Sequence, residues 1–147
     1  HLNVGQNSVS NVEVIAAAIT GKSGPATLNL VGESLVQHST TADRNGYAAQ
    51  QVRSLSLAEL LLEARVEKCD YLKMDCEGAE FDILFNTSPG TLQKIQRFCM
   101  EVHDKMTHYT REDMLRFLKT NGYQSRLTPN PVHDDLALLY AWRGEAE

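Results

Sequence analysis

The chain has 147 residues, which is enough for one domain with a single hydrophobic core, and we expect one domain over residues 1–147. Its net charge of −5 argues against binding to nucleic acid or to anionic membranes, because both interactions require basic patches. No apolar run is long enough to span a bilayer and the first residues show no secretory pattern, so we expect a cytoplasmic protein.

The cysteines point to the same compartment. Cys69, Cys76 and Cys99 are odd in number and form no C-x-x-C pair. This arrangement argues against a disulfide scaffold or a zinc knuckle and favours free thiols in a reducing environment. Each cysteine lies in or beside a predicted strand, where a free thiol behaves as a small hydrophobic group.

The first part of the chain predicts two strands and a long connection. The apolar run Val12–Ile19 indicates a strand buried on both faces, although its alanines also suit a helix. Turn residues follow at 21–25, and Ala26–Val31 alternates as a half-buried strand does. Residues 32–50 are rich in Ser, Thr, Asn and Gly, which is typical of a long loop.

The rest of the chain alternates between strands and helices. Ser56 and Glu59 have the spacing of a capping box, which predicts a helix as far as about Val66. The further predicted elements are a strand over 71–75, a short helix over 79–85 broken at 88–90, a strand over 97–102, a helix from Thr110 to Gly122, and strands over 123–127 and 136–142. This order predicts an open α/β sheet, parallel in its middle and covered by helices. The last two strands are joined too tightly for a helical crossover, so they are expected to be antiparallel.

Polar residues gather where the two central strands end. Asp75, Glu77 and Gly78 follow the strand over 71–75, and Glu101 and His103 end the next one. Open α/β sheets bind ligands at the carboxyl ends of their strands, where adjacent parallel strands bring these side chains together. Carboxylates bind hydroxyl or cationic groups, histidine accepts protons near neutral pH, and Gly78 permits a sharp turn or close approach of a ligand.

Other roles for these residues remain open. Glu77 or Glu80 can stabilise the start of the following helix through the helix dipole. Asp75, Glu77 and His103 have the chemistry of metal ligands, although the chain contains no H-E-x-x-H spacing. Cys76 can act as a nucleophile only if His103 and a pair of anion-stabilising donors lie close by. His133 lies in a predicted loop and is expected to be solvated.

One extended pattern resembles a known family. Lys73-x-Asp75-x-Glu77-Gly78-x-Glu80, followed by a strand that ends in Glu-x-His at position 103, is similar to the FkbM-like S-adenosylmethionine-dependent methyltransferases. The start of the helix at Ser56 also resembles that family, with Ala58 where the family usually has Asp. The resemblance covers nearly the whole chain. It implies a partial Rossmann-like methyltransferase sheet with an antiparallel pair of strands at its C-terminal end.

The resemblance also implies a reaction. In that family, methyl transfer from S-adenosylmethionine to a hydroxyl group of a sugar or polyketide-type small molecule needs alignment of the reacting atoms and a base. Asp75 or His103 is expected to be the base. The substrate or the cofactor is expected to contact Lys73, Glu77, Gly78 and Glu101, and no metal ligand is implied.

The family's cofactor-binding loop has no counterpart in this sequence. The family holds its cofactor with a glycine-rich loop after the first strand, and this chain, which begins at His1, contains no G-x-G. We therefore expect the C-terminal part of such a domain, which alone binds S-adenosylmethionine weakly or not at all. A non-catalytic α/β remnant that binds a partner or ligand is the alternative, and a metal-dependent hydrolase is a third hypothesis.

The same comparison predicts self-association. If the first strand of such a sheet is missing, the strand Tyr71–Asp75 has one unpaired edge, and unpaired edges invite pairing with another chain. We therefore expect a homodimer or a higher oligomer with this strand or Val12–Ile19 at its interface.

Overall fold

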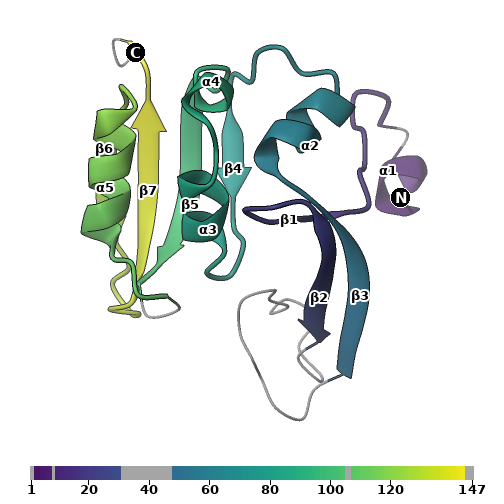
Figure 1. The fold of residues 1–147 in the computed structure, drawn as a ribbon, viewed down its shortest axis with the longest axis horizontal. Helices are drawn as coiled ribbons and strands as arrows, with labels where there is room; N and C mark the ends of the chain where they lie inside the picture. Colours follow the sequence, from purple (N-terminus) through teal and green to yellow (C-terminus); the bar gives the residue numbers. More distant parts are fainter. Residues whose placement is uncertain (1, 8, 31–47, 105–106, 145–147) are drawn as a thin grey trace.

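The computed structural model describes residues 2–7, 9–30, 48–104 and 107–144, and Figure 1 shows their arrangement. Within these ranges the chain forms two sheets with helices packed beside them. The elements are α1 (Leu2–Gln6), β1 (Ala18–Ile19), β2 (Gly24–Leu30), β3 (Ala48–Leu55), α2 (Leu57–Glu63), β4 (Leu72–Met74), α3 (Glu80–Phe85), α4 (Pro89–Leu92), β5 (Arg97–His103), α5 (Arg111–Thr120), β6 (Gln124–Pro129) and β7 (Leu136–Trp142).

The larger sheet has the strand order β4-β5-β7-β6. β4 runs parallel to β5, whereas β7 is antiparallel to both β5 and β6. The α/β class and the antiparallel C-terminal pair predicted from the sequence are therefore confirmed. The described strands form two separate sheets. The smaller sheet contains β1, β3 and β2, and none of these strands pairs with β4, which pairs only with β5 among the described strands.

The hydrophobic core lies between the larger sheet and helices α3, α4 and α5, which Figure 1 shows in front of the strands. Alternate residues of β5, namely Phe98, Met100 and Val102, are fully buried against these helices. A strand presents successive side chains to opposite faces, so Glu101 and His103 lie on the other face of β5. None of the described helices is long and apolar enough to cross a membrane. The cytoplasmic location stays a prediction.

The capping box predicted at Ser56 is present, and the helix predicted from Thr110 begins with a second one. Ser56 accepts a hydrogen bond from the backbone N–H of Glu59, whose carboxylate binds the N–H of Ser56 in return. Thr110 and Asp113 make the same exchange at the start of α5. Both helices thus begin where the sequence predicts, because a capping box depends only on residues three positions apart.

Two expectations need correction, and one short helix was not predicted. Most of Val12–Ile19 is not a strand, because Val12 and Val14 are largely exposed and only the last two residues pair with β3. The predicted loop over 32–50 falls mainly outside the described residues, and its last three residues begin β3. Helix α3 ends at Phe85, before the break predicted at 88–90, but the sequence did not predict that α4 begins there, with Pro89 in its first turn, where its missing N–H costs nothing.

Gly21 joins the smaller sheet to α3. Its backbone N–H donates to the Oδ2 atom of Asp82 at 2.7 Å. A Cβ atom at this position would lie 2.5 Å from Asp82 Oδ1 and 2.6 Å from the Asp82 carbonyl oxygen. Because the second contact is with backbone, only glycine allows this close approach without moving α3.

We predict that Gly21→Ala lowers the free energy of unfolding by about 1–3 kcal/mol, the usual cost of overpacking a buried site. Gly90→Ala is the matched control, because a Cβ atom there meets nothing within 4 Å. Urea unfolding monitored by circular dichroism measures both changes. Equal stabilities for the two variants would contradict the role assigned to Gly21.

Candidate functional site

The turn after β4 has an unusual backbone. Glu77 has a φ of 50° and Gly78 a φ of 98°, so two consecutive residues lie in the left-handed region. Glycine adopts this conformation freely, whereas a residue with a side chain pays about 1–2 kcal/mol. Gly78 therefore makes the sharp turn expected from the sequence, and the conformation of Glu77 has to be stabilised by its surroundings.

Glu80 supplies that stabilisation. Its carboxylate accepts hydrogen bonds from the backbone N–H of Cys76 at 2.8 Å and from that of Gly78 at 3.1 Å. The side chain is completely buried. Glu80 lies in the first turn of α3, where the sequence predicts a helix-dipole role, but its carboxylate bonds back to the turn that carries Glu77.

His103 lies next to this buried carboxylate. Its Nδ1 atom is 3.6 Å from Glu80 Oε1, and its Nε2 atom is 4.0 Å from Glu77 Oε2. Only 17% of the side chain is exposed. The Glu80 carboxylate raises the pKa of His103 above its usual value, and Glu77 and Glu101 add to this effect, while burial opposes it. The ring therefore keeps its proton to a higher pH than a free histidine does.

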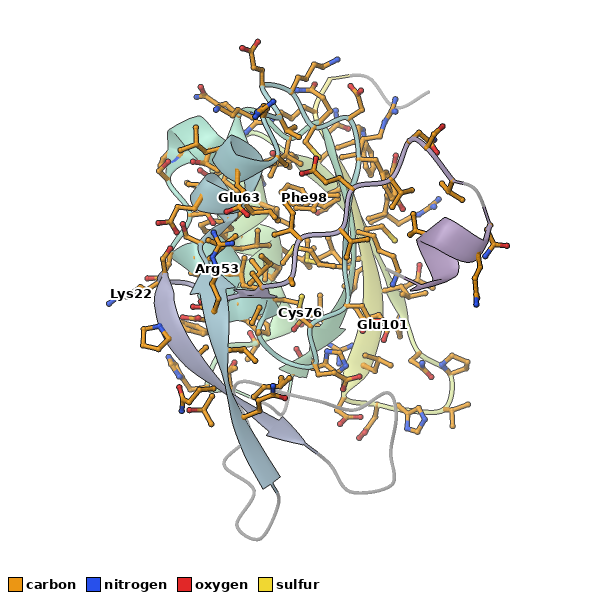
Figure 2. All side chains as sticks on the ribbon, turned by 90° about the vertical axis from the view of Figure 1, so that its right-hand side faces the viewer. Lys22, Arg53, Glu63, Cys76, Phe98 and Glu101 are labelled. Carbon is orange, nitrogen blue, oxygen red and sulfur yellow. The ribbon has the colours of Figure 1, made fainter. Side chains whose placement is uncertain are left out.

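A hollow of about 330 Å³ opens beside His103. It is lined by Glu77, Glu101 and His103, from the ends of β4 and β5, and by His133 and Asp135 of the β6–β7 connection with Leu136, the first residue of β7. Figure 2 shows Cys76 and Glu101 at the same end of the sheet, below Phe98. The hollow thus lies where the parallel strands β4 and β5 end, as expected for an open α/β sheet.

The wall formed by the β6–β7 connection is tied to the rest of the site. Asp104 accepts a hydrogen bond from the N–H of Arg111 at 2.7 Å and forms an ion pair with its guanidinium group. The guanidinium group of Arg111 also donates to the carbonyl oxygen of Asp134 at 2.8 Å. The backbone N–H of Asp104 donates to the carbonyl oxygen of Asp135 at 3.0 Å. These bonds hold Asp135 against the end of β5.

Other candidate residues lie apart from the hollow. Asp75 is exposed and faces Lys73, with 3.4 Å between Oδ2 and Nζ, and neither residue lines the hollow. Burial raises the pKa of the Cys76 thiol to about 11, so it is protonated and a weak nucleophile at neutral pH. Within the described ranges, no three His, Cys, Asp or Glu side chains form a group that could hold a metal ion.

Sequence reasoning missed the contribution of the β6–β7 connection. His133, which is exposed as expected, lines the hollow together with Asp135. This contribution could have been predicted from the antiparallel pairing of β5 and β7. That pairing places the start of β7 beside the end of β5, and His103 is indeed paired with Leu136. Glu80 was identified within the motif, but its burial against His103 was not predicted.

Comparisons with known proteins place the chain in a family. The sequence profile of the methyltransferase FkbM domain matches residues 1–125. The AMB antimetabolite synthetase AmbE of Pseudomonas aeruginosa is 33% identical over 85 residues, which amount to 56% of this chain and 4% of the synthetase. No solved structure is significantly similar. Because the profile covers most of its length, this chain belongs to the family of the methyltransferase FkbM domain.

Proposed function

We propose that the chain provides the acceptor-binding and proton-accepting part of an O-methyltransferase that acts on a hydroxyl group of a sugar or polyketide-type small molecule. The observation that carries this proposal is the position of His103 at the mouth of an acidic hollow, at the strand ends of a member of the FkbM methyltransferase family. Histidine is the side chain most often used to accept a proton near neutral pH.

The chemistry of the hollow favours the acceptor over the whole methyl donor. Glu77, Glu101 and Asp135 accept hydrogen bonds from hydroxyl groups and attract positive charge. Among the described residues that line the hollow, only Leu136 is apolar, which leaves little surface on which an adenine ring can pack. None of these described lining residues is Lys or Arg, so the hollow favours neutral or cationic acceptors over those with a carboxylate or phosphate next to the reacting hydroxyl.

S-adenosylmethionine, the donor that the family implies, supplies an electrophilic methyl group on a sulfonium. The residues of this chain act on the other reactant. The carboxylates of Glu77 and Glu101 hold and orient the acceptor, and Nε2 of His103 takes the hydroxyl proton as the oxygen becomes methylated. Asp75 remains the second candidate for the base, at the exposed side of the same turn.

We predict that His103→Asn lowers the rate of methyl transfer by about 100-fold or more, as the loss of a general base does. The assay measures transfer of labelled methyl from S-adenosylmethionine to a panel of neutral, cationic and anionic polyols. The donor is used at millimolar concentration, because we propose that this chain binds it more weakly than micromolar. Micromolar binding in a calorimetric titration would contradict that part of the proposal.

His108→Asn is the control, because His108 is exposed and lies outside the hollow. The wild-type rate is expected to rise with pH and to reach half its maximum above pH 6.5, since the base works only when neutral and its pKa is raised. Equal loss of activity in both histidine variants, or a preference for anionic acceptors, would count against the proposal.

We also propose that the chain pairs with a second copy of itself along β4. In the described part of the chain the outer edge of β4 has no strand partner. The side chain of Tyr71, just before the strand, is 54% exposed, and Leu138 on β7 is 49% exposed. Both an unpaired edge and exposed apolar side chains favour association. The non-catalytic alternative depends on the same surface.

Sedimentation velocity tests the pairing. We expect a dimer that dissociates on dilution and that Tyr71→Lys weakens, because the substitution places a charge beside the strand edge. Val132→Lys is the control, since Val132 is 79% exposed in the β6–β7 connection. A wild-type chain that remains monomeric across the micromolar range would refute the pairing.

A further inference from the structure

The buried carboxylate of Glu80 does more than close a turn. Buried carboxylates are rare unless their oxygens are paired, and the two oxygens of Glu80 accept the N–H groups of Cys76 and Gly78. A carboxylate has about four acceptor positions, so these two bonds leave further acceptor capacity. Part of it is directed at His103, whose Nδ1 atom lies 3.6 Å from Oε1.

The Nδ1 atom of His103 is itself buried. Among the described residues it has no hydrogen-bond partner at ordinary distance, and Glu80 Oε1 is beyond that distance by only a few tenths of an ångström. A buried donor or acceptor left unpaired costs about 1–3 kcal/mol, so a small rotation of the ring that closes this gap is favoured. Catalytic hydrogen bonds are often long before substrate binds and tighten in the complex.

The chemistry of the pair decides which nitrogen carries the proton. An ionised carboxylate only accepts hydrogen bonds, so a neutral imidazole facing Glu80 is stabilised when its hydrogen is on Nδ1. Nε2 then keeps its lone pair. This second nitrogen lies 4.0 Å from Glu77 Oε2, beside the hollow lined by Glu77, Glu101 and His103. A hydroxyl group in the hollow therefore meets the nitrogen that can take its proton.

We infer that Glu80 is a positioning residue: its buried carboxylate holds His103 in the tautomer with hydrogen on Nδ1 and turns Nε2 toward the acceptor. The effect of Glu80 on catalysis rests on the function proposed above, whereas its effect on the tautomer of His103 does not. The same carboxylate holds the turn that presents Glu77, so one side chain aligns two of the residues that line the hollow. His103 and Glu80 come from different elements, β5 and α3, and only the fold brings them together.

Several groups face His103 and contribute to its titration. Glu80 approaches from α3, Glu77 from the turn after β4, and Glu101 from the same strand. His133 and Asp135 line the same hollow from the β6–β7 connection. Glu80 lies 3.6 Å from Nδ1, closer than Glu77 lies to Nε2. Removal of the Glu80 carboxylate is therefore expected to change both the pKa and the tautomer of His103. Removal of the Glu101 carboxylate is expected to change the pKa alone.

The test is nitrogen NMR on the full chain with labelled histidines. Long-range proton–nitrogen spectra, assigned with His103→Asn, report the tautomer and the pH midpoint of His103. We expect the form with hydrogen on Nδ1 in the wild type and a midpoint above pH 6.5. Glu80→Gln is expected to lower the midpoint and to populate hydrogen on Nε2, because an amide NH₂ facing Nδ1 favours that form. Glu101→Gln, the matched control, is expected to lower the midpoint without changing the tautomer.

The activity of the same variants separates positioning from simple electrostatics. In Glu80→Gln more His103 is neutral at pH 7, yet kcat is expected to fall by about 100-fold or more because the orienting carboxylate is lost. KM is expected to rise less than kcat falls, because Glu80 also supports the turn that carries Glu77. Glu80→Asp, which restores the carboxylate, is expected to recover part of kcat. A purely structural role would lower kcat only with the folded fraction, which circular dichroism measures.

Two results would overturn the inference: hydrogen on Nε2 in the wild-type chain, or an unchanged tautomer in folded Glu80→Gln. If Glu80→Gln does not fold, the wild-type tautomer alone decides. Failure of the proposed function looks different. A chain with hydrogen on Nδ1 of His103 but no methyl transfer to any acceptor would refute the reaction and leave the positioning role of Glu80 in place.

Discussion

The candidate site depends on the carboxylate of Glu80. Two backbone N–H groups of the turn after β4 bind to it, and this turn holds two successive residues at positive φ. β4 is only three residues long and pairs with one of the described strands, so sheet pairing contributes little to the conformation of the turn. The hydrogen bonds from backbone N–H groups to the buried Glu80 carboxylate fix the conformation of the turn, which the short strand does not. The direction of Glu77 and the surroundings of His103 both follow from it.

The acidic hollow combines two kinds of support. One side is built from the ends of β4 and β5 and depends on the core behind them, where Met74 and Met100 pair across the strands. The other side comes from the β6–β7 connection and depends on polar bonds that involve Asp104 and Arg111. The first wall depends on the core of the fold, whereas the second depends on the guanidinium group of Arg111 and one backbone hydrogen bond from Asp104 to Asp135.

Much of this architecture can be predicted from sequence, and the limits have physical causes. Capping boxes at Ser56 and Thr110 are local, so two helix starts are predicted correctly. The strand β3 was missed because Gln50, Gln51 and Arg53 in its middle are polar and exposed, so the segment lacks a clear apolar pattern, and pairing with β2 makes it a strand. Asp75, Glu77, Glu101 and His103 were predicted to meet because parallel strands end together, and all of them except Asp75 line the hollow. The burial of Glu80 could not be predicted, because it depends on how α3 packs against β5.

Helix α3 serves two neighbours at once. Glu80 and Asp82 are two residues apart in its first turn, and they bind the turn after β4 and the backbone of Gly21 respectively. The segment around Gly21 and the carboxylate beside His103 are therefore joined through one helical turn. Positions 21, 80 and 103 are far apart in the sequence but linked by these contacts, so we expect a substitution at one of them to change which substitutions the other two can tolerate during evolution.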